Sequence, residues 1–302
     1  MAINRAQIRD LLLPGLAGIE GKYPQIPTQW SQIFARATSK MALERKVEAR
    51  YLSLAQNKNE GGPTPFDNAA GERFVFNIDI FSFGLGFAQT RESLADNLYK
   101  DSFHPSAMGL VESFQQTKEI VGANVLNTAT TFNANIQGDG VSLVNAAHPI
   151  DGNTYANRPS TDIDLNEASL EAALNAIRIY PDQAGLKTFA RGRKLVVPYQ
   201  LNFVAERLTK TELRTGTSDN DVNAIMSSGA LPDGYIVNDF LTSAFAWFVL
   251  SNVKGLICYD REPFEMDLQI DPTTGNLLCI GFERYGFGFF NPRSIWGTFP
   301  TS

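Results

Sequence analysis

Alternating apolar and polar residues predict a β-hairpin early in the chain. The stretch RFVFNIDIF places four apolar side chains on one face of a strand: Phe74, Phe76, Ile78 and Ile80. A partner strand is expected over Val47–Leu54, and residues 55–72 between the two are rich in glycine, proline and polar side chains. A loop this long without a core of its own is generally functional or disordered. We therefore expect a hairpin with an extended tip.

Helical spacing dominates the next part of the chain. Apolar residues recur at steps of three and four from Phe103 to Phe132, with Ser102 as the expected N-cap. A helix of roughly 28 residues spans about 40 Å, so we expect it to form the spine of the fold. A shorter amphipathic helix is predicted in DLNEASLEAALNAIRIYPD, where Pro181 stops it.

Shorter pieces of helical pattern lie near the N-terminus, over Asn4–Leu13 and Thr28–Ala35. Prolines and glycines separate these pieces, and helices this short are unstable alone in water. The segment is therefore expected to be an arm that lies on the rest of the chain or on a neighbour.

The C-terminal part mixes strands with short helices. RGRKLVVPYQLNFVAERLTK predicts a strand, a proline and a helix, followed by a polar loop over Thr211–Asp233. Two short strands are expected in YIVNDFL and AWFVLSN, and two long strands flank the turn DPTTGN. In the last strand aromatic residues alternate with Gly286 and Gly288. This order of elements predicts an α+β fold.

Composition and charge narrow the range of possible functions. The 302 residues are 43% hydrophobic, enough for a large core, and the net charge of -6 argues against a surface that grips nucleic acid directly. A protein that encloses DNA is not excluded. The basic stretches at Glu44–Arg50 and Arg191–Lys194 are expected to be solvated or interface faces. Cys258 and Cys279 are predicted to be buried free thiols of a protein made in the cytoplasm, with no signal peptide and no membrane span.

Candidate chemistry is sparse. Neither His104 nor His148 has a Cys, Asp or Glu at a recognised metal or triad spacing. The stretches GLGFAQ and GFGFFN lack the third glycine of a dinucleotide turn, and no G-x-S-x-G motif occurs. The residues therefore predict no catalytic group, no cofactor and no metal site.

Several stretches carry a resemblance to a known family. MAINRAQIRDLLLPGL, GFAQTRESLADNLY, TKEIVGANVLNTA, RGRKLVVPYQLNFVAERLTKTELRTGTSDNDVNAI and ERYGFGFFNPRSIWG are similar to Mu-like or prophage-type major head subunits of tailed bacteriophages (Caudoviricetes), with the Hong Kong 97 fold. The resemblance implies four regions: an N-terminal arm at 1–46, an extended loop at 47–88, a peripheral domain at 89–185 and 265–302, and an axial domain at 186–264.

The resemblance also implies a function. Such a subunit assembles with itself into pentamers and hexamers of an icosahedral capsid that encloses double-stranded DNA without sequence-specific binding. It is a virion component that works with a portal protein and possible scaffold, protease and decoration proteins, and it needs no membrane, cofactor or enzyme activity. Expected interface residues are Trp30, Phe34, Arg50, Lys58, Phe66, Arg73, Arg214, Asp219, Asn220 and Asp221. Expected packing residues are Phe114, Gly286, Phe287, Gly288 and Phe289, with the two glycines admitting the spine helix closely.

Alternatives remain open at this point. The same fold serves encapsulin-like nanocompartment shells, and an unrelated hydrolase using His148 is a further alternative. Some relatives carry a cleaved N-terminal scaffolding segment, whereas here Met1 leads straight into the arm, so a separate scaffold or none is expected. A few relatives cross-link neighbours through a Lys and an Asn, for which Lys58 and Asn276 are the corresponding candidates.

Overall fold

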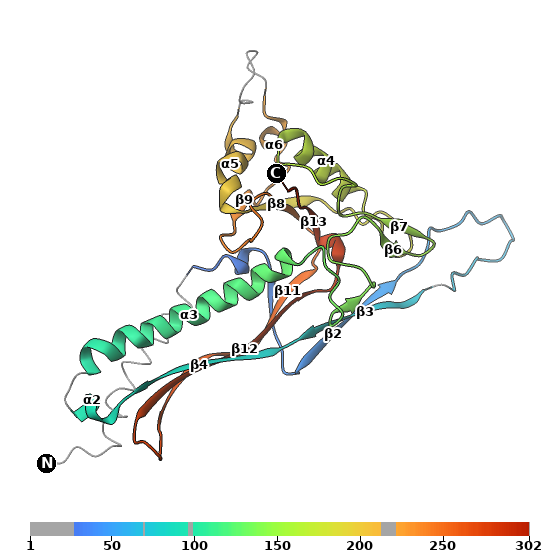
Figure 1. Cartoon of the computed structure of the whole chain (residues 1–302). Helices are drawn as coiled ribbons and strands as arrows, with labels where there is room; N and C mark the ends of the chain where they lie inside the picture. The colour runs from blue at the N-terminus through green and yellow to red at the C-terminus, as the bar shows by residue number, and fades with distance from the viewer. Residues whose placement is uncertain (1–26, 69, 96–98, 213–221, 302) are drawn as a thin grey trace.

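The computed structural model describes residues 27–68, 70–95, 99–212 and 222–301. In its lower part, helix α3 (Tyr99–Asn127) runs along a thin sheet, and the upper part holds a second sheet with α4 (Glu167–Arg178), α5 (Asn202–Lys210) and α6 (Ala224–Ser227) (Figure 1). A long loop projects away from both parts. The predicted α+β class is confirmed.

The long sheet has the strand order β1-β11-β12-β4. Its bounds are β1 Ala35–Thr38, β4 Phe81–Gln89, β11 Leu256–Ile270 and β12 Leu277–Phe289. The predicted closing hairpin is confirmed, because β11 pairs antiparallel with β12 around the turn at Asp271. In contrast, the helix expected over Thr28–Ala35 is wrong. Only one 3-10 turn forms, η2 (Trp30–Gln32), because the chain then extends to pair in parallel with β11.

Helix α3 covers one face of this sheet, as the apolar spacing predicts. Its inward side chains and those of β11 and β12 form one buried cluster. The helix contributes Phe103, Ala107, Leu110, Val111 and Phe114, and the strands contribute Phe264, Leu268, Leu277 and Cys279. The predicted ends of the helix need correction. It begins at Tyr99 after the short helix α2 (Arg91–Ala95), so Ser102 lies inside it and is not its N-cap, and it ends at Asn127, before Phe132.

The predicted hairpin is present, with its base shifted toward the N-terminus. β2 (Leu43–Arg50) pairs antiparallel with β3 (Gly71–Asp79), and β3 also pairs with the short strand β5 (Gln137–Gly138). Phe76, Ile78 and Ile80 are buried, as the alternation predicts. Residues 51–70 between the strands form the projecting loop of Figure 1.

The upper sheet has the order β13-β10-β8-β9, with α4 packed on one face. Its bounds are β8 Gly192–Val197, β9 Tyr235–Val237, β10 Trp247–Ser251 and β13 Ile295–Thr298. The turns η3 (Tyr199–Leu201) and η4 (Pro292–Ser294) and the hairpin of β6 (His148–Ile150) with β7 (Asn153–Tyr155) complete the described elements. Asn166 caps α4 through the backbone N–H of Ser169, so this predicted helix is confirmed.

The glycines of β12 admit a close neighbour, but the expected neighbour is wrong. A Cβ on Gly286 would overlap the Asp79 carbonyl oxygen and lie 3.3 Å from the Ile80 Cα, and one on Gly288 would lie 2.8 Å from Ile78 Cγ1. The element that approaches is therefore the end of β3, not the spine helix. The spine contacts the opposite side of β12 instead.

That side holds the aromatic residues. The Phe287 ring packs edge-on against Trp30 and Phe34, with centroids 5.4 and 5.1 Å away. A Cβ on Gly122 of α3 would lie 3.2 Å from the Phe287 ring, and one on Gly281 of β12 would lie 2.7 Å from the Phe114 ring of α3, so these two glycines admit the close contact between spine and sheet. Phe289 packs on Phe76 of the hairpin at 6.0 Å.

Candidate functional site

The two arms of the projecting loop expose large apolar side chains next to the base of the hairpin. Phe66 is 86% exposed and Leu54 is 75% exposed, and both line a hollow of about 760 Å³ between the two arms of the loop. Phe66 was predicted as an interface residue, and the structure leaves its ring without cover by the described residues of its own chain. Such a surface is typical of a contact with another molecule. Lys58 is exposed on the same loop.

The base of the loop, in contrast, is tied to its own chain. Arg50 Nε lies 3.0 Å from Asp151 Oδ2 in the β6–β7 turn, and Arg73 Nη1 lies 3.4 Å from the other oxygen of the same carboxylate. Arg50 also pairs with Asp67 at 3.6 Å. The predicted residues Arg50 and Arg73 are thus brought together on one aspartate, across about 80 to 100 residues of sequence that no local pattern bridges.

A second set of contacts, which is buried, also holds the base of the loop. The Arg293 guanidinium forms an ion pair with Glu48 of β2, donates to the Pro181 carbonyl and lies over the Tyr155 ring, 4.6 Å from its centroid. Arg293 is only 2% exposed. Because a buried charge is costly unless it is paired and hydrogen-bonded, this pairing holds the loop base firmly against η4 and the β6–β7 hairpin.

Trp30 and Phe34, expected at an interface, lie instead in the core of the chain. They are 5% and 4% exposed within their own chain, and their role at an interface between copies stays a prediction. Their place is explained by η2, whose N-terminal amides are held by the spine. The Glu119 carboxylate accepts from the backbone N–H of Gln29 at 2.7 Å and of Trp30 at 3.0 Å. Burial raises the pKa of Glu119, these two hydrogen bonds lower it, and the nearby Asp239 raises it further.

The same region contains a buried charge cluster. Lys118 Nζ lies 2.9 Å from Asp260 Oδ1 and 2.5 Å from Glu283 Oε1, joining α3 to β11 and β12. Arg36 adds a second cation at Asp260, at 2.5 Å. Burial alone lowers the pKa of Lys118, but the charges and hydrogen bonds of the two carboxylates outweigh burial and raise it. The cluster joins the spine to both long strands of the sheet.

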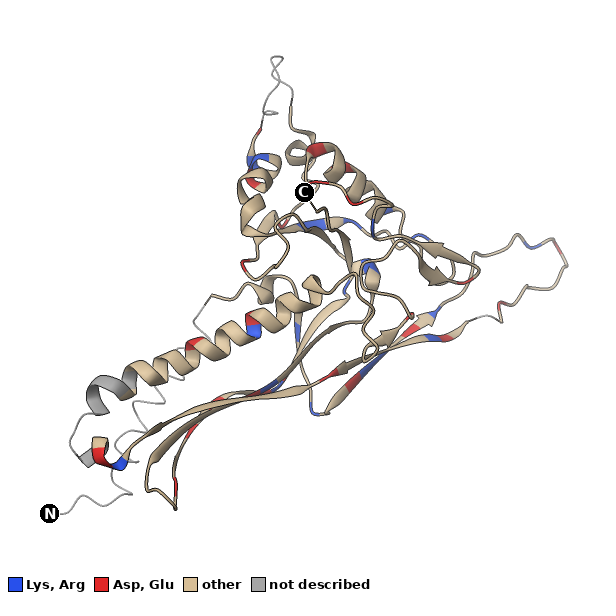
Figure 2. Cartoon of the chain, in the orientation of Figure 1, with Lys and Arg blue, Asp and Glu red and all other residues tan. Residues whose placement is uncertain are grey.

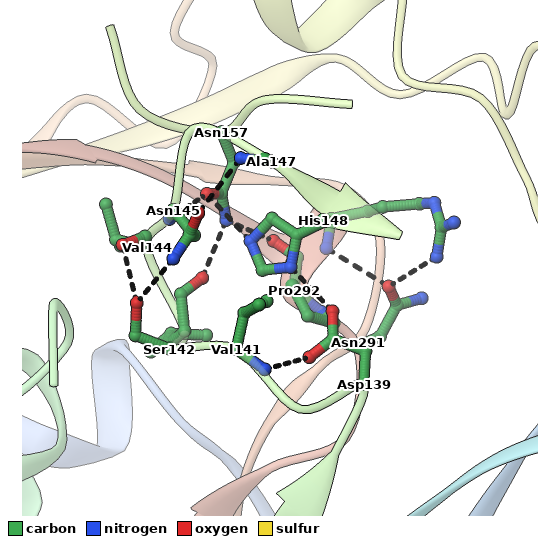
Figure 3. A network of polar contacts seen from close by, with 12 residues as sticks. Asp139, Val141, Ser142, Val144, Asn145, Ala147, His148, Asn157, Asn291 and Pro292 are labelled. Carbon is green, nitrogen blue, oxygen red and sulfur yellow. Dashed lines mark hydrogen bonds and ion pairs between the residues drawn. The ribbon is translucent and has the colours of Figure 1, made fainter. Parts of the chain in front are cut away.

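His148, the strongest enzyme alternative, belongs to a structural network (Figure 3). Its Nδ1 lies 2.6 Å from Asp139 and its Nε2 lies 3.0 Å from the Asn157 side-chain oxygen, while Asn157 Nδ2 donates to the carbonyls of Leu143 and Pro292. The ring is fully buried, so no substrate reaches it. The sequence does not reveal Asp139 as its partner, because a turn rather than a recognised motif brings the two together.

Other expectations have simple outcomes. Cys258 and Cys279 are free and buried, as predicted. The described part of the chain contains no group of three or more His, Cys, Asp or Glu residues that would hold a metal ion, and no helix in that part is long and apolar enough to cross a membrane. The predicted interface residues Arg214, Asp219, Asn220 and Asp221 lie outside the described residues.

Comparisons with known proteins identify the family. A family model described as phage capsid protein matches residues 76–297, and the chain belongs to this family. It is therefore a capsid protein, a structural component of the virion.

Solved structures show the same fold at low sequence identity. The capsid of a native GTA particle aligns over 91% of this chain and 92% of its own, with 10% identity and a TM-score of 0.58. The procapsid of bacteriophage JBD30 aligns over 99% and 77%, with 12% identity and a TM-score of 0.52. This chain spans 64% of the chain in the JBD30 capsid structure. A virus-like particle from Pyrococcus furiosus aligns over 94% and 97%, with 12% identity and a TM-score of 0.51. A search of curated proteins finds no match.

The Hong Kong 97-type fold and the phage capsid function expected from the resemblance are thereby confirmed. The likeness to the virus-like particle shows a shared fold only. The family match is to phage capsids, and this match outweighs the encapsulin-like alternative.

Proposed function

We propose that copies of this chain join through the exposed apolar side chains of the projecting loop, which lies on a second copy within pentamers and hexamers of the shell. The observation that carries this proposal is the contrast along one hairpin. The loop base is fixed by Asp151 and Arg293, while Leu54 and Phe66 on the loop beyond it are exposed to solvent. A preorganised loop loses less conformational entropy on binding than a free one.

For the regions of the chain we propose the four boundaries that the family resemblance implies. Residues 1–46 are the arm, 47–88 the extended loop, 89–185 and 265–302 the peripheral domain, and 186–264 the axial domain. β4 links the second and third of these, because it continues from the hairpin and pairs along β12. We place Arg214, Asp219, Asn220 and Asp221 at the capsomer centre.

We further propose that the assembled head encloses double-stranded DNA without reading its sequence and meets a portal protein, with a separate scaffold or protease and decoration proteins as further partners. The net charge of -6 supports a shell wall with little overall attraction for DNA. A cross-link between Lys58 and Asn276 of neighbouring copies stays a prediction, and a denaturing gel of mature particles that shows only monomer contradicts it.

Electron microscopy of the purified full chain tests the loop contact. The wild type, co-expressed with its neighbouring genes where it stays monomeric alone, is expected to form closed shells or rings of five and six. The double variant Leu54→Ser, Phe66→Ser is expected to stay folded but unassembled. A control replaces Phe132, 47% exposed in the turn that follows the spine, by serine and is expected to assemble normally. Normal shells from the loop variant refute the proposed contact.

A further inference from the structure

Two hollows adjoin at the start of β8, where Arg193 and Asn252 line both of them. One, of about 390 Å³, lies against the end of α4, and the other, of about 230 Å³, lies against η2 and the turn between β10 and β11. The two hollows share these lining residues at one end of the upper sheet, and together we call them the depression.

Basic side chains line this depression. The five are Arg178, Arg191, Arg193, Lys194 and Lys254. They come from α4, from β8 and the residue before it, and from the β10–β11 turn, so the stretch RGRK is only the part of the group visible in the sequence. Figure 2 shows the basic stretch on β8 within a molecule whose charges are otherwise mixed.

Only one carboxylate lines the two hollows. Asp233 pairs with Arg193 at 2.9 Å, and Lys194 donates to the Gln32 carbonyl at 3.2 Å. For Arg178, Arg191 and Lys254, no ion pair forms with any carboxylate that the structure describes. A local excess of positive charge in a chain of net charge -6 is a specific feature rather than a consequence of composition.

The walls of the depression are fixed by the backbone. Asn252 donates its N–H to the Arg191 carbonyl and accepts the Arg191 N–H through its side-chain oxygen, each at 2.9 Å. Ser294, 4% exposed, lines the smaller hollow, and its Oγ has no hydrogen-bond partner among the described residues. A buried hydroxyl without a partner is costly, and an anionic oxygen in the hollow would satisfy it.

We propose that this depression binds the phosphate backbone of nucleic acid and is the place where the shell contacts the DNA inside it. Clustered cations on a fixed wall suit phosphate groups, and the depression has no base-reading feature, so the contact is independent of sequence. Such a patch holds DNA locally although the subunit as a whole is acidic. The source of the ligand rests on the proposed enclosure of DNA, whereas the binding test below does not depend on assembly.

The test uses the full chain in unassembled form and a short DNA duplex of arbitrary sequence, with affinity measured over a series of salt concentrations. The triple variant Arg178→Gln, Arg191→Gln, Lys254→Gln leaves the Asp233 pair and the Gln32 contact intact. Each lost phosphate contact lowers the slope of log affinity against log salt by about 0.9. The triple is therefore expected to lower the slope by about 2 to 3 and to weaken binding at least tenfold at roughly 0.1 M salt.

A matched control removes the same charge elsewhere. Lys40→Gln, Arg45→Gln, Lys46→Gln takes three exposed cations from the hairpin and the turn before it and is expected to leave the slope largely unchanged. Equal losses from both triples mean that only net charge matters and overturn the proposal. A patch triple that binds DNA normally but assembles poorly shows that the depression receives an acidic segment of a second copy, which also overturns it.

Discussion

Replacement of Gly286 by alanine tests how the projecting hairpin is joined to the long sheet. The added Cβ would overlap the Asp79 carbonyl oxygen and lie 3.1 Å from the carbonyl carbon, so the backbone of β3 has to move away from β12. Backbone cannot yield as a flexible side chain does, and overpacking of this kind costs about 1–3 kcal/mol. Alanine recovers up to about 0.5–1 kcal/mol of the glycine penalty in a strand. We therefore expect a net loss of about 1–2 kcal/mol in the free energy of unfolding.

The measurement is thermal and denaturant unfolding of the purified subunit, with Gly84→Ala as the matched control. Gly84 lies in the neighbouring strand β4, and a Cβ there would meet its nearest neighbour at 3.9 Å, an ordinary contact. The control is expected to be neutral or slightly stabilising. At roughly 2–4 °C per kcal/mol, Gly286→Ala should lower the midpoint by about 2–8 °C. Equal midpoints for the two variants would refute the close approach of β3.

Three further perturbations address the charges that hold the fold. Lys118→Met leaves Asp260 and Glu283 buried without their shared cation, so we expect denaturant unfolding to show a loss of about 3–5 kcal/mol, largely restored when both acids are made amides. Because the folded-state pKa of Glu119 is raised, the native state binds more protons than the unfolded one just above the ordinary value. Stability should therefore fall as pH rises through that window, and Glu119→Gln should flatten the unfolding free energy measured against pH there. Asp151→Asn removes the carboxylate that Arg50 and Arg73 share and is expected to speed limited proteolysis within the loop. The free energy of unfolding should change by at most about 1 kcal/mol, because the ion pairs are partly exposed. Unchanged cleavage would show that this carboxylate does not restrain the loop.

Local patterns account well for the elements. Period-two alternation predicts the buried face of β3, helical spacing predicts α3 and α4, and the turn at Asp271 predicts the closing hairpin. These features depend on neighbours a few residues away, so the sequence carries them directly. The boundaries were less accurate, as the ends of α3 show.

Contacts between segments that are distant in the sequence could not be predicted from local patterns. Gly286 and Gly288 indicate a close neighbour, but nothing local tells β3 from the spine. Glu119 is one of many acids on a helix until η2 is placed on it. The basic depression needs α4, β8 and the β10–β11 turn to meet at one end of a sheet, and the stretch RGRK alone fits a solvated strand equally well.

Buried ion pairs and exposed apolar side chains lie in different parts of the chain. Buried ions lie where the structure must be rigid: Lys118 between the spine and its sheet, and Arg293 under the loop base. On the projecting loop beside these anchors, the apolar side chains of Leu54 and Phe66 are exposed. Such side chains contribute attraction without direction, because burial of apolar surface is not directional. In the proposed loop contact, direction therefore comes from the ion pairs of Asp151 and Arg293, which fix the base of the loop, more than from the apolar side chains that would make the contact.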